Sequence, residues 1–184
     1  MSRPRVLLAD DHRMVAEGLK TLLSPDFDLV GMVEDGAALV EAARVLRPDV
    51  IVADIGMPRL NGFEALAELR KEDPGVRVVF LTMHQEAAYA RRALEAGALG
   101  FVLKHSAPDE LVTAIRAALE GRTYVTPALA GALQRTSTRS PETVTESEAT
   151  LSARQREILQ FLADGRSAKE IARRLNISHR IEGQ

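Results

Sequence analysis

The run Val50-Ile51-Val52-Ala53-Asp54-Ile55-Gly56-Met57-Pro58 decides how this chain folds. A short apolar run that is rich in β-branched residues is typical of a strand buried on both faces of a sheet. It ends in the carboxylate of Asp54, and in open α/β sheets ligands bind at the carboxyl ends of the strands. A single aspartate at a strand end is most often only a turn residue, so Asp54 alone does not indicate a function.

Three further apolar runs end in polar side chains, and together they change that interpretation. The side chains are those of Asp10, Asp11, Thr82 and Lys104. Parallel strands would bring all of them to one edge of the sheet with Asp54. Three carboxylates repel each other unless they surround a hard divalent cation, and Mg2+ prefers such oxygen ligands. The amine supplies a point charge for a bound oxyanion, and the hydroxyl can hydrogen-bond the same anion.

The surrounding sequence predicts an α/β fold. Strand-like and helix-like patterns alternate five times, which indicates a parallel sheet with helices on both sides. One predicted helix runs from Ala87 to Ala96 and is closed by Gly97. Ser106 is a candidate N-cap for the next helix, with Asp109 in a capping box. Sequence pattern alone leaves the order of the strands open.

These polar groups, in this order on successive strand ends, resemble the receiver domain of two-component response regulators. The resemblance covers residues 4–121, and Gly62 after the Asp54 run matches the pattern around the phosphorylation site of that family. It implies a flavodoxin-like, doubly wound (βα)5 receiver with strand order 2-1-3-4-5. It also implies that a sensor histidine kinase phosphorylates Asp54, and it leaves open a homodimer that forms on phosphorylation.

The resemblance assigns a role to each residue at this edge. Asp11 would be a direct Mg2+ ligand, Asp10 would bind partly through water, and the Gly56 backbone carbonyl would complete the site together with Asp54. Thr82 and Lys104 would hold the phosphoryl oxygens.

Two further residues receive roles beside the pocket. Phe101 would be either a core aromatic or, as we favour, a switch that turns inward when Thr82 moves to the phosphoryl group. His84 would lie at the rim and tune the lifetime of the phosphoryl group, since a role as an acid or base is the weaker interpretation.

The rest of the chain predicts a connector and a second domain. We expect a receiver at 1–122, a linker with a short helix at 123–150 and an incomplete all-α segment at 151–184. Thr126 and Pro127 could start the short helix, which would end near Leu133, and a flexible linker would follow from Gln134.

Two capped helical patterns after residue 150 suggest a helix-turn-helix. The run from Leu151 to Ser178 resembles the LuxR-type DNA-binding domain, and with the receiver it resembles the NarL/FixJ class of transcriptional regulators. Because the sequence stops at Gln184, before a full recognition helix, we expect specific binding to promoter DNA to be lost. Basic side chains here could contact only phosphates, which position a protein without specifying a sequence: Arg154, Arg156, Lys169, Arg173 and Arg174.

The composition bears on the kinds of metal site, on partners and on location. The 184 residues carry a net charge of −2 and no cysteine, so no disulfide or thiolate zinc site is available. Residues 1–150 carry a balance of −5 and residues 151–184 one of +3, which is weak evidence for a tail that faces nucleic acid. The start of the chain does not resemble a signal peptide and no run is long enough to cross a membrane, so we expect no membrane partner and a cytoplasmic location.

Two rival functions share this fold. A haloacid-dehalogenase-type phosphatase also uses a nucleophilic aspartate and Mg2+, but it needs a second aspartate two residues later, where this chain has Gly56. A flavodoxin-like cofactor binder would need a phosphate cradle after the first strand, where Asp10 and Asp11 would repel a phosphate. We therefore expect a phosphoacceptor and not an enzyme, with loss of the phosphoryl group by its own hydrolysis only.

Overall fold

The computed structural model describes residues 2–137. These residues form alternating strands and helices in the following order: β1 (Arg5–Ala9), α1 (Arg13–Leu23), β2 (Asp28–Val33), α2 (Gly36–Leu46), β3 (Val50–Asp54), α3 (Gly62–Glu72), β4 (Val78–Thr82), α4 (Ala87–Glu95), β5 (Gly100–Leu103), the 3-10 turn η1 (Lys104–Ser106), α5 (Ala107–Leu119), β6 (Tyr124–Val125) and α6 (Pro127–Ser137). Among the described helices, none combines the length and the apolarity that crossing a bilayer requires.

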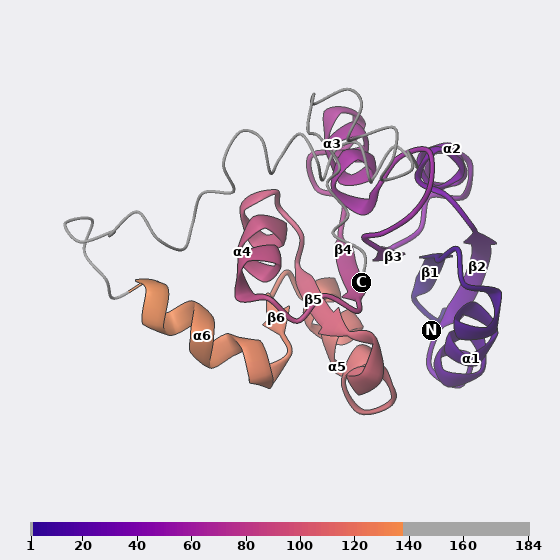
Figure 1. The fold of residues 1–184 in the computed structure, drawn as a ribbon. Helices are drawn as coiled ribbons and strands as arrows, with labels where there is room; N and C mark the ends of the chain where they lie inside the picture. Colours follow the sequence, from indigo (N-terminus) through magenta and orange to yellow (C-terminus); the bar gives the residue numbers. More distant parts are fainter. Residues whose placement is uncertain (1, 138–184) are drawn as a thin grey trace, which may run out of the picture. The chain divides into compact units, whose positions relative to one another are not determined.

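All strands of the sheet are parallel, and their order is β2-β1-β3-β4-β5-β6. The predicted order 2-1-3-4-5 is therefore confirmed, with one strand added at the β5 edge (Figure 1). The three central strands β1, β3 and β4 are almost wholly buried, as their unbroken apolar runs require. Their carboxyl ends consequently lie together at one edge.

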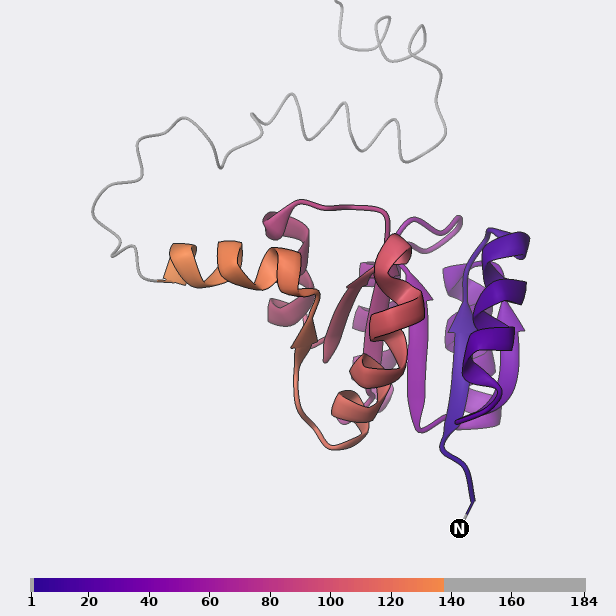
Figure 2. The same ribbon diagram turned by 90° about the horizontal axis from the view of Figure 1, so that it is seen from below.

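Helices cover both faces of the sheet. Alternate residues of β3 point to opposite sides: Ile51 packs with α2, α3 and α4, whereas Val52 packs with α1 and α5. Figure 2 shows these two layers of helices seen from below. Each face has its own apolar cluster, so the sheet is held from both sides and its strand ends are fixed in place.

Some helix ends follow local sequence signals, and one predicted signal is not used. Asn61 and Glu64 form a capping box at the start of α3, and Gly97 has a φ of 99° just after α4, as predicted for its closing residue. The predicted cap at Ser106 is wrong: its backbone is helical and its side chain makes no capping hydrogen bond. The turn η1 lies directly between β5 and α5, so the chain enters α5 without a side-chain cap at the N-terminus of this helix.

The connector after α5 joins the sheet. Tyr124–Val125 pairs with β5, an arrangement that the sequence did not predict. Helix α6 begins at Pro127 as predicted, but it runs to Ser137 and so passes the expected end at Leu133. The Thr126 hydroxyl lies against β5, where it accepts a hydrogen bond of 3.1 Å from the Leu103 backbone N–H.

The remaining predictions concern residues outside the described part of the chain. They are the linker beyond residue 137, the two helices between residues 151 and 176, and the basic side chains Arg154, Arg156, Lys169, Arg173 and Arg174.

Candidate functional site

Four strands bring the predicted site residues to one edge of the sheet. The register pairs Ala9 with Ala53, and Thr82 with Leu103, so Asp10 and Asp54 come from adjacent strand ends and Lys104 follows β5, which β4 separates from β3. This convergence depends on the parallel order of the strands, because antiparallel neighbours would carry these groups to opposite ends.

Lys104 joins two of the carboxylates. Its Nζ donates a hydrogen bond of 3.0 Å to Asp54 Oδ2 and lies 2.9 Å from Asp10 Oδ2. The side chains of Lys104, Asp10 and Asp54 are only 7%, 1% and 8% exposed. Burial lowers the pKa of Lys104, but the two carboxylates outweigh burial and hold that pKa above its usual value. The ammonium therefore remains charged and offsets the repulsion between the two buried acids.

One buried oxygen of this group has a single polar partner. Asp10 Oδ2 forms an ion pair of 2.9 Å with the ammonium of Lys104 and has no other hydrogen-bond partner among the described residues. Buried carboxylate oxygens are normally hydrogen-bonded or bound to a cation. This oxygen and its neighbours Asp11 and Asp54 are the hard oxygen donors that a divalent metal ion takes, so the cluster is compatible with such an ion.

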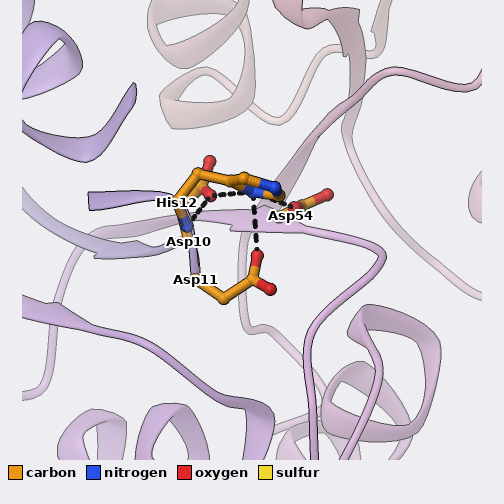
Figure 3. A group of neighbouring side chains, drawn as sticks. All are labelled: Asp10, Asp11, His12 and Asp54. Atoms are coloured by element: carbon orange, nitrogen blue, oxygen red, sulfur yellow. Dashed lines mark hydrogen bonds and ion pairs between the residues drawn. The ribbon is translucent and has the colours of Figure 1, made fainter. Parts of the chain in front are cut away.

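His12 belongs to the same cluster and was missed by the sequence analysis. One atom from each of Asp10, Asp11, His12 and Asp54 lies within 4.8 Å of the others (Figure 3). The backbone N–H of His12 also donates a hydrogen bond of 2.8 Å to Asp10 Oδ1. The signal for this residue was its place directly after two acids, since histidine is the commonest metal ligand in proteins.

Gly56 and Gly62 shape the backbone around Asp54. The Gly56 backbone N–H donates a hydrogen bond of 3.2 Å to Asp54 Oδ1, and the residue leaves open space beside it. At Gly62, a Cβ atom would lie 2.8 Å from the Asp54 carbonyl oxygen and 2.8 Å from the Phe80 ring. Only glycine therefore lets α3 approach β3 this closely.

The remaining predicted residues lie in β4 and β5 or directly after β4. Thr82 is 1% exposed, and its hydroxyl accepts a hydrogen bond of 3.1 Å from the His84 backbone N–H. The His84 ring stacks on Tyr89 with centroids 4.2 Å apart, which places this ring on α4. Phe101 is fully buried in the cluster under α2, α3 and α4, so its ring occupies the inward position.

Two family models match the chain. The response regulator receiver domain matches residues 6–116, and the luxR family of bacterial regulatory proteins matches residues 149–180. The first match covers almost all of strands β1 to β5 and the acidic cluster described above, and it ends before β6. The second lies outside the described residues.

Individual relatives match over most of their length. The transcriptional regulatory protein MctR of Rhizobium johnstonii is 38% identical, over 95% of this chain and 79% of that protein. The nitrate/nitrite response regulator protein NarL of Escherichia coli K12 is 37% identical, over 94% and 81%.

Solved structures agree with these relatives. A LuxR-family two-component response regulator from Aurantimonas has a TM-score of 0.71 at 37% identity and covers 75% of this chain and 100% of its own. The response regulator RcsB, solved in complex with DNA, has a TM-score of 0.68 at 27% identity and covers 95% and 84%.

Proposed function

The chain belongs to the response-regulator family, and from this premise we propose that Asp54 accepts the phosphoryl group in its two-component system. The protein is a transcriptional response regulator that joins a receiver domain to a LuxR-type segment. The observation that carries the proposal for Asp54 is its buried carboxylate, which lies at the strand edge between Lys104 and the acidic cluster.

The proposed reaction is phosphoryl transfer from a kinase histidine. An Asp54 oxygen forms a bond to phosphorus, the phosphorus–nitrogen bond to the donor breaks, and the donor imidazole keeps the electron pair. Such transfers need positioning and electrostatic stabilisation more than covalent chemistry from the protein. Lys104 is placed to shift from the Asp54 carboxylate to a phosphoryl oxygen, and the Thr82 hydroxyl to hydrogen-bond another.

We propose Mg2+ as the metal of this site, with Asp10, Asp11, Asp54 and the Gly56 carbonyl as its protein ligands. The clustering of these three carboxylates, with one atom of each within 4.8 Å of the others, supports this assignment. When bound, the ion would neutralise negative charge on the phosphoryl oxygens.

Loss of the phosphoryl group would occur by attack of water on the acyl phosphate. Gly56 leaves open space next to Asp54, and the His84 ring, two residues after Thr82, stacks on Tyr89. We propose that these two positions set how long the phosphoryl group persists. Phe101 and Thr82 would then report its presence to the β5 side of the molecule.

The partners are inferred from the family. A sensor histidine kinase would supply the phosphoryl group, and the segment at 151–184, joined to a receiver at 1–122 by the connector 123–150, would act on promoter DNA. The similarity to RcsB, which was solved with DNA, supports the second inference. A homodimer formed on phosphorylation fits the same family.

The phosphatase alternative has no support. The family matches are to regulators, and Gly56 stands where that enzyme class needs its second aspartate.

Phosphorylation by a small donor tests the proposal directly. With acetyl phosphate and Mg2+, intact-protein mass spectrometry should detect one added phosphoryl group on the wild-type chain and none on Asp54→Asn. Asp26→Asn is a matched control, because Asp26 is a surface carboxylate paired with Arg116, and it should be labelled like the wild type. Full labelling of Asp54→Asn would refute the assignment of Asp54.

A further inference from the structure

Three side chains hold the end of β5 on the side away from β4. The Thr126 hydroxyl accepts a hydrogen bond of 3.1 Å from the Leu103 backbone N–H, and it lies 3.4 Å from Glu110 Oε2, to which it donates. The Tyr124 hydroxyl donates a hydrogen bond of 2.8 Å to the other oxygen, Glu110 Oε1. We call Glu110, Tyr124 and Thr126 the β5 clamp, because they join α5 and β6 to the last residue of β5.

The polar groups of Thr126 connect two elements. Its backbone N–H donates to the Phe101 carbonyl, and its backbone carbonyl accepts from the Leu129 and Ala130 N–H groups in the first turn of α6. In a continued parallel ladder this carbonyl would accept from the Leu103 N–H, but it has turned into the helix. The hydroxyl takes its place and continues the pairing to the end of β5.

Glu110 determines how the Thr126 hydroxyl is oriented. A hydroxyl can donate and accept, whereas an ionised carboxylate only accepts. Thr126 therefore directs its proton to Glu110 and keeps a lone pair for the Leu103 N–H. Within residues 2–137, Glu110 forms no ion pair, so the hydroxyls of Tyr124 and Thr126 are the partners that satisfy it. Such a carboxylate contributes hydrogen bonds of defined direction at the strand end.

The clamp lies one residue from the lysine of the site. Leu103 is paired with Thr82 on its other side and is followed directly by Lys104. The Lys104 ammonium lies 2.9 Å from Asp10 Oδ2 and 3.0 Å from Asp54 Oδ2. A shift of the strand end would move the start of this side chain, and misplacing a catalytic group by about 1 Å can cost on the order of 100-fold in rate.

We propose that the β5 clamp positions Lys104 for phosphoryl transfer, with Glu110 and Thr126 as its positioning residues. The inference rests on the proposed function, because Lys104 is the group that would hold a phosphoryl oxygen. The clamp itself touches neither Asp54 nor the acidic cluster, and it acts through the backbone of Leu103. Through Thr126 it also joins the start of α6 to the same strand end.

The rate at which acetyl phosphate labels Asp54 in the presence of Mg2+ tests this role, with the full chain and mass spectrometry. Thr126→Val should slow labelling about tenfold, since the clamp acts one residue away from the lysine. Glu110→Gln should slow it in the same direction, and Thr126→Ser, which retains the hydroxyl, should restore the wild-type rate. Thr21→Val is the control, because that hydroxyl bonds only the Glu17 carbonyl on α1 among the described residues, and it should label like the wild type.

A double-mutant cycle separates positioning of Lys104 from a general loss of structure. If the clamp acts through the lysine, Thr126→Val should change the rate by less than about twofold once Lys104→Gln is present. Where labelling of Lys104→Gln is too slow to follow, affinity for beryllium fluoride with Mg2+, a mimic of the phosphoryl group, gives the same comparison. An equal loss in both backgrounds, or a wild-type rate in Thr126→Val, would overturn the proposal.

Urea denaturation establishes that each variant is folded under the assay conditions. If Thr126→Val is unfolded, Glu110→Gln carries the same cycle, because it keeps the size of the side chain and replaces one acceptor oxygen by a donor.

The clamp and the proposed function fail separately. Wild-type protein labelled on Asp54, with an unchanged rate in folded clamp variants, would remove only the role of the clamp. Labelling of Asp54→Asn would refute the proposed function, whatever the rates of the clamp variants.

Discussion

At the carboxyl edge of the sheet, the charge of a single residue offsets the repulsion between carboxylates that the fold buries together. Asp10 and Asp54 are buried side by side, and the ammonium of Lys104 lies within 3.0 Å of both. Breaking a buried ion pair leaves an uncompensated charge, whereas breaking an exposed pair costs little. The stability of the site in the absence of metal therefore depends on one side chain.

Lys104→Met is expected to lower the free energy of unfolding by up to about 3 kcal/mol in the presence of a chelator, because two buried carboxylates lose their cation. Added Mn2+ or Mg2+ should restore part of this loss. Urea denaturation measures both effects. Lys71→Met is the control, since Lys71 is 68% exposed and pairs with Glu68 on the same helix. It should cost less than about 1 kcal/mol. Equal effects of the two substitutions would contradict this account of Lys104.

Of the two glycines beside Asp54, only Gly62 should be sensitive to an added methyl group. Gly62→Ala forces an atom against the Asp54 carbonyl and the Phe80 ring, each at 2.8 Å. Such overpacking should cost about 1–3 kcal/mol of stability. Gly56→Ala meets nothing within 4 Å and should be nearly neutral. Urea denaturation of both variants decides the point, and a tolerated Gly62→Ala would show that α3 can move away from β3.

At the scale of elements, one side-chain hydrogen bond adds to the backbone pairing that holds β6 on β5. It has only two residues, Tyr124 and Val125, yet it extends the sheet beyond β5. Thr126 is 2% exposed, and its hydroxyl accepts from Leu103 N–H at the end of β5, one residue before Lys104. The start of α6 is thus attached to the strand that carries the site lysine.

Thr126→Val should loosen this attachment. The substitution keeps the shape of the side chain but leaves the buried Leu103 N–H without its acceptor, which should cost about 1–3 kcal/mol. Hydrogen exchange at the Leu103 amide should accelerate, and NMR can follow it. Thr126→Ser retains the hydroxyl and should preserve slow exchange. Slow exchange in Thr126→Val would mean that this hydroxyl does not hold β6 in place.

For the whole molecule, the ionisation of one tyrosine lowers the free energy of unfolding at high pH. Burial, followed by the hydrogen bond of 2.8 Å to Glu110 and the charge of that carboxylate, raises the pKa of Tyr124 to about 12. The neutral phenol is therefore favoured in the folded state. Its contribution to stability is complete below the ordinary tyrosine pKa of about 10 and is lost as pH rises towards the folded value.

The phenolate absorbance can detect this titration, because the chain has two tyrosines and no tryptophan. We expect a late step near pH 12 in the wild type, with circular dichroism recorded in parallel to follow folding. The late step should persist in Tyr89→Phe and disappear in Tyr124→Phe. Over the same pH interval, the wild type should lose stability relative to Tyr124→Phe. A late step that survives in Tyr124→Phe would refute the assignment.

The amino-acid sequence by itself determined the framework of the receiver. Unbroken β-branched runs specify strands buried on both faces, and the alternation with helical patterns specifies a parallel sheet. Parallel strands place all their carboxyl ends at one edge, which is why the sequence pattern is enough to group Asp10, Asp54 and Lys104. The match of these residues to a family pattern then supplied the strand order that periodicity left open.

Tertiary structure alone decided the position of His12, the existence of β6 and the partner of the Thr126 hydroxyl. A strand of two residues has no periodicity to recognise, so β6 depends on the free edge of β5 that it pairs with. The His12 ring is mostly exposed; its Nδ1 lies near the two acids that directly precede it and also near Asp54, which comes from another strand end. The pairing of β6 with β5, the hydrogen bond of the Thr126 hydroxyl and the approach of His12 to Asp54 each join residues distant in sequence, and only the folded sheet brings them together.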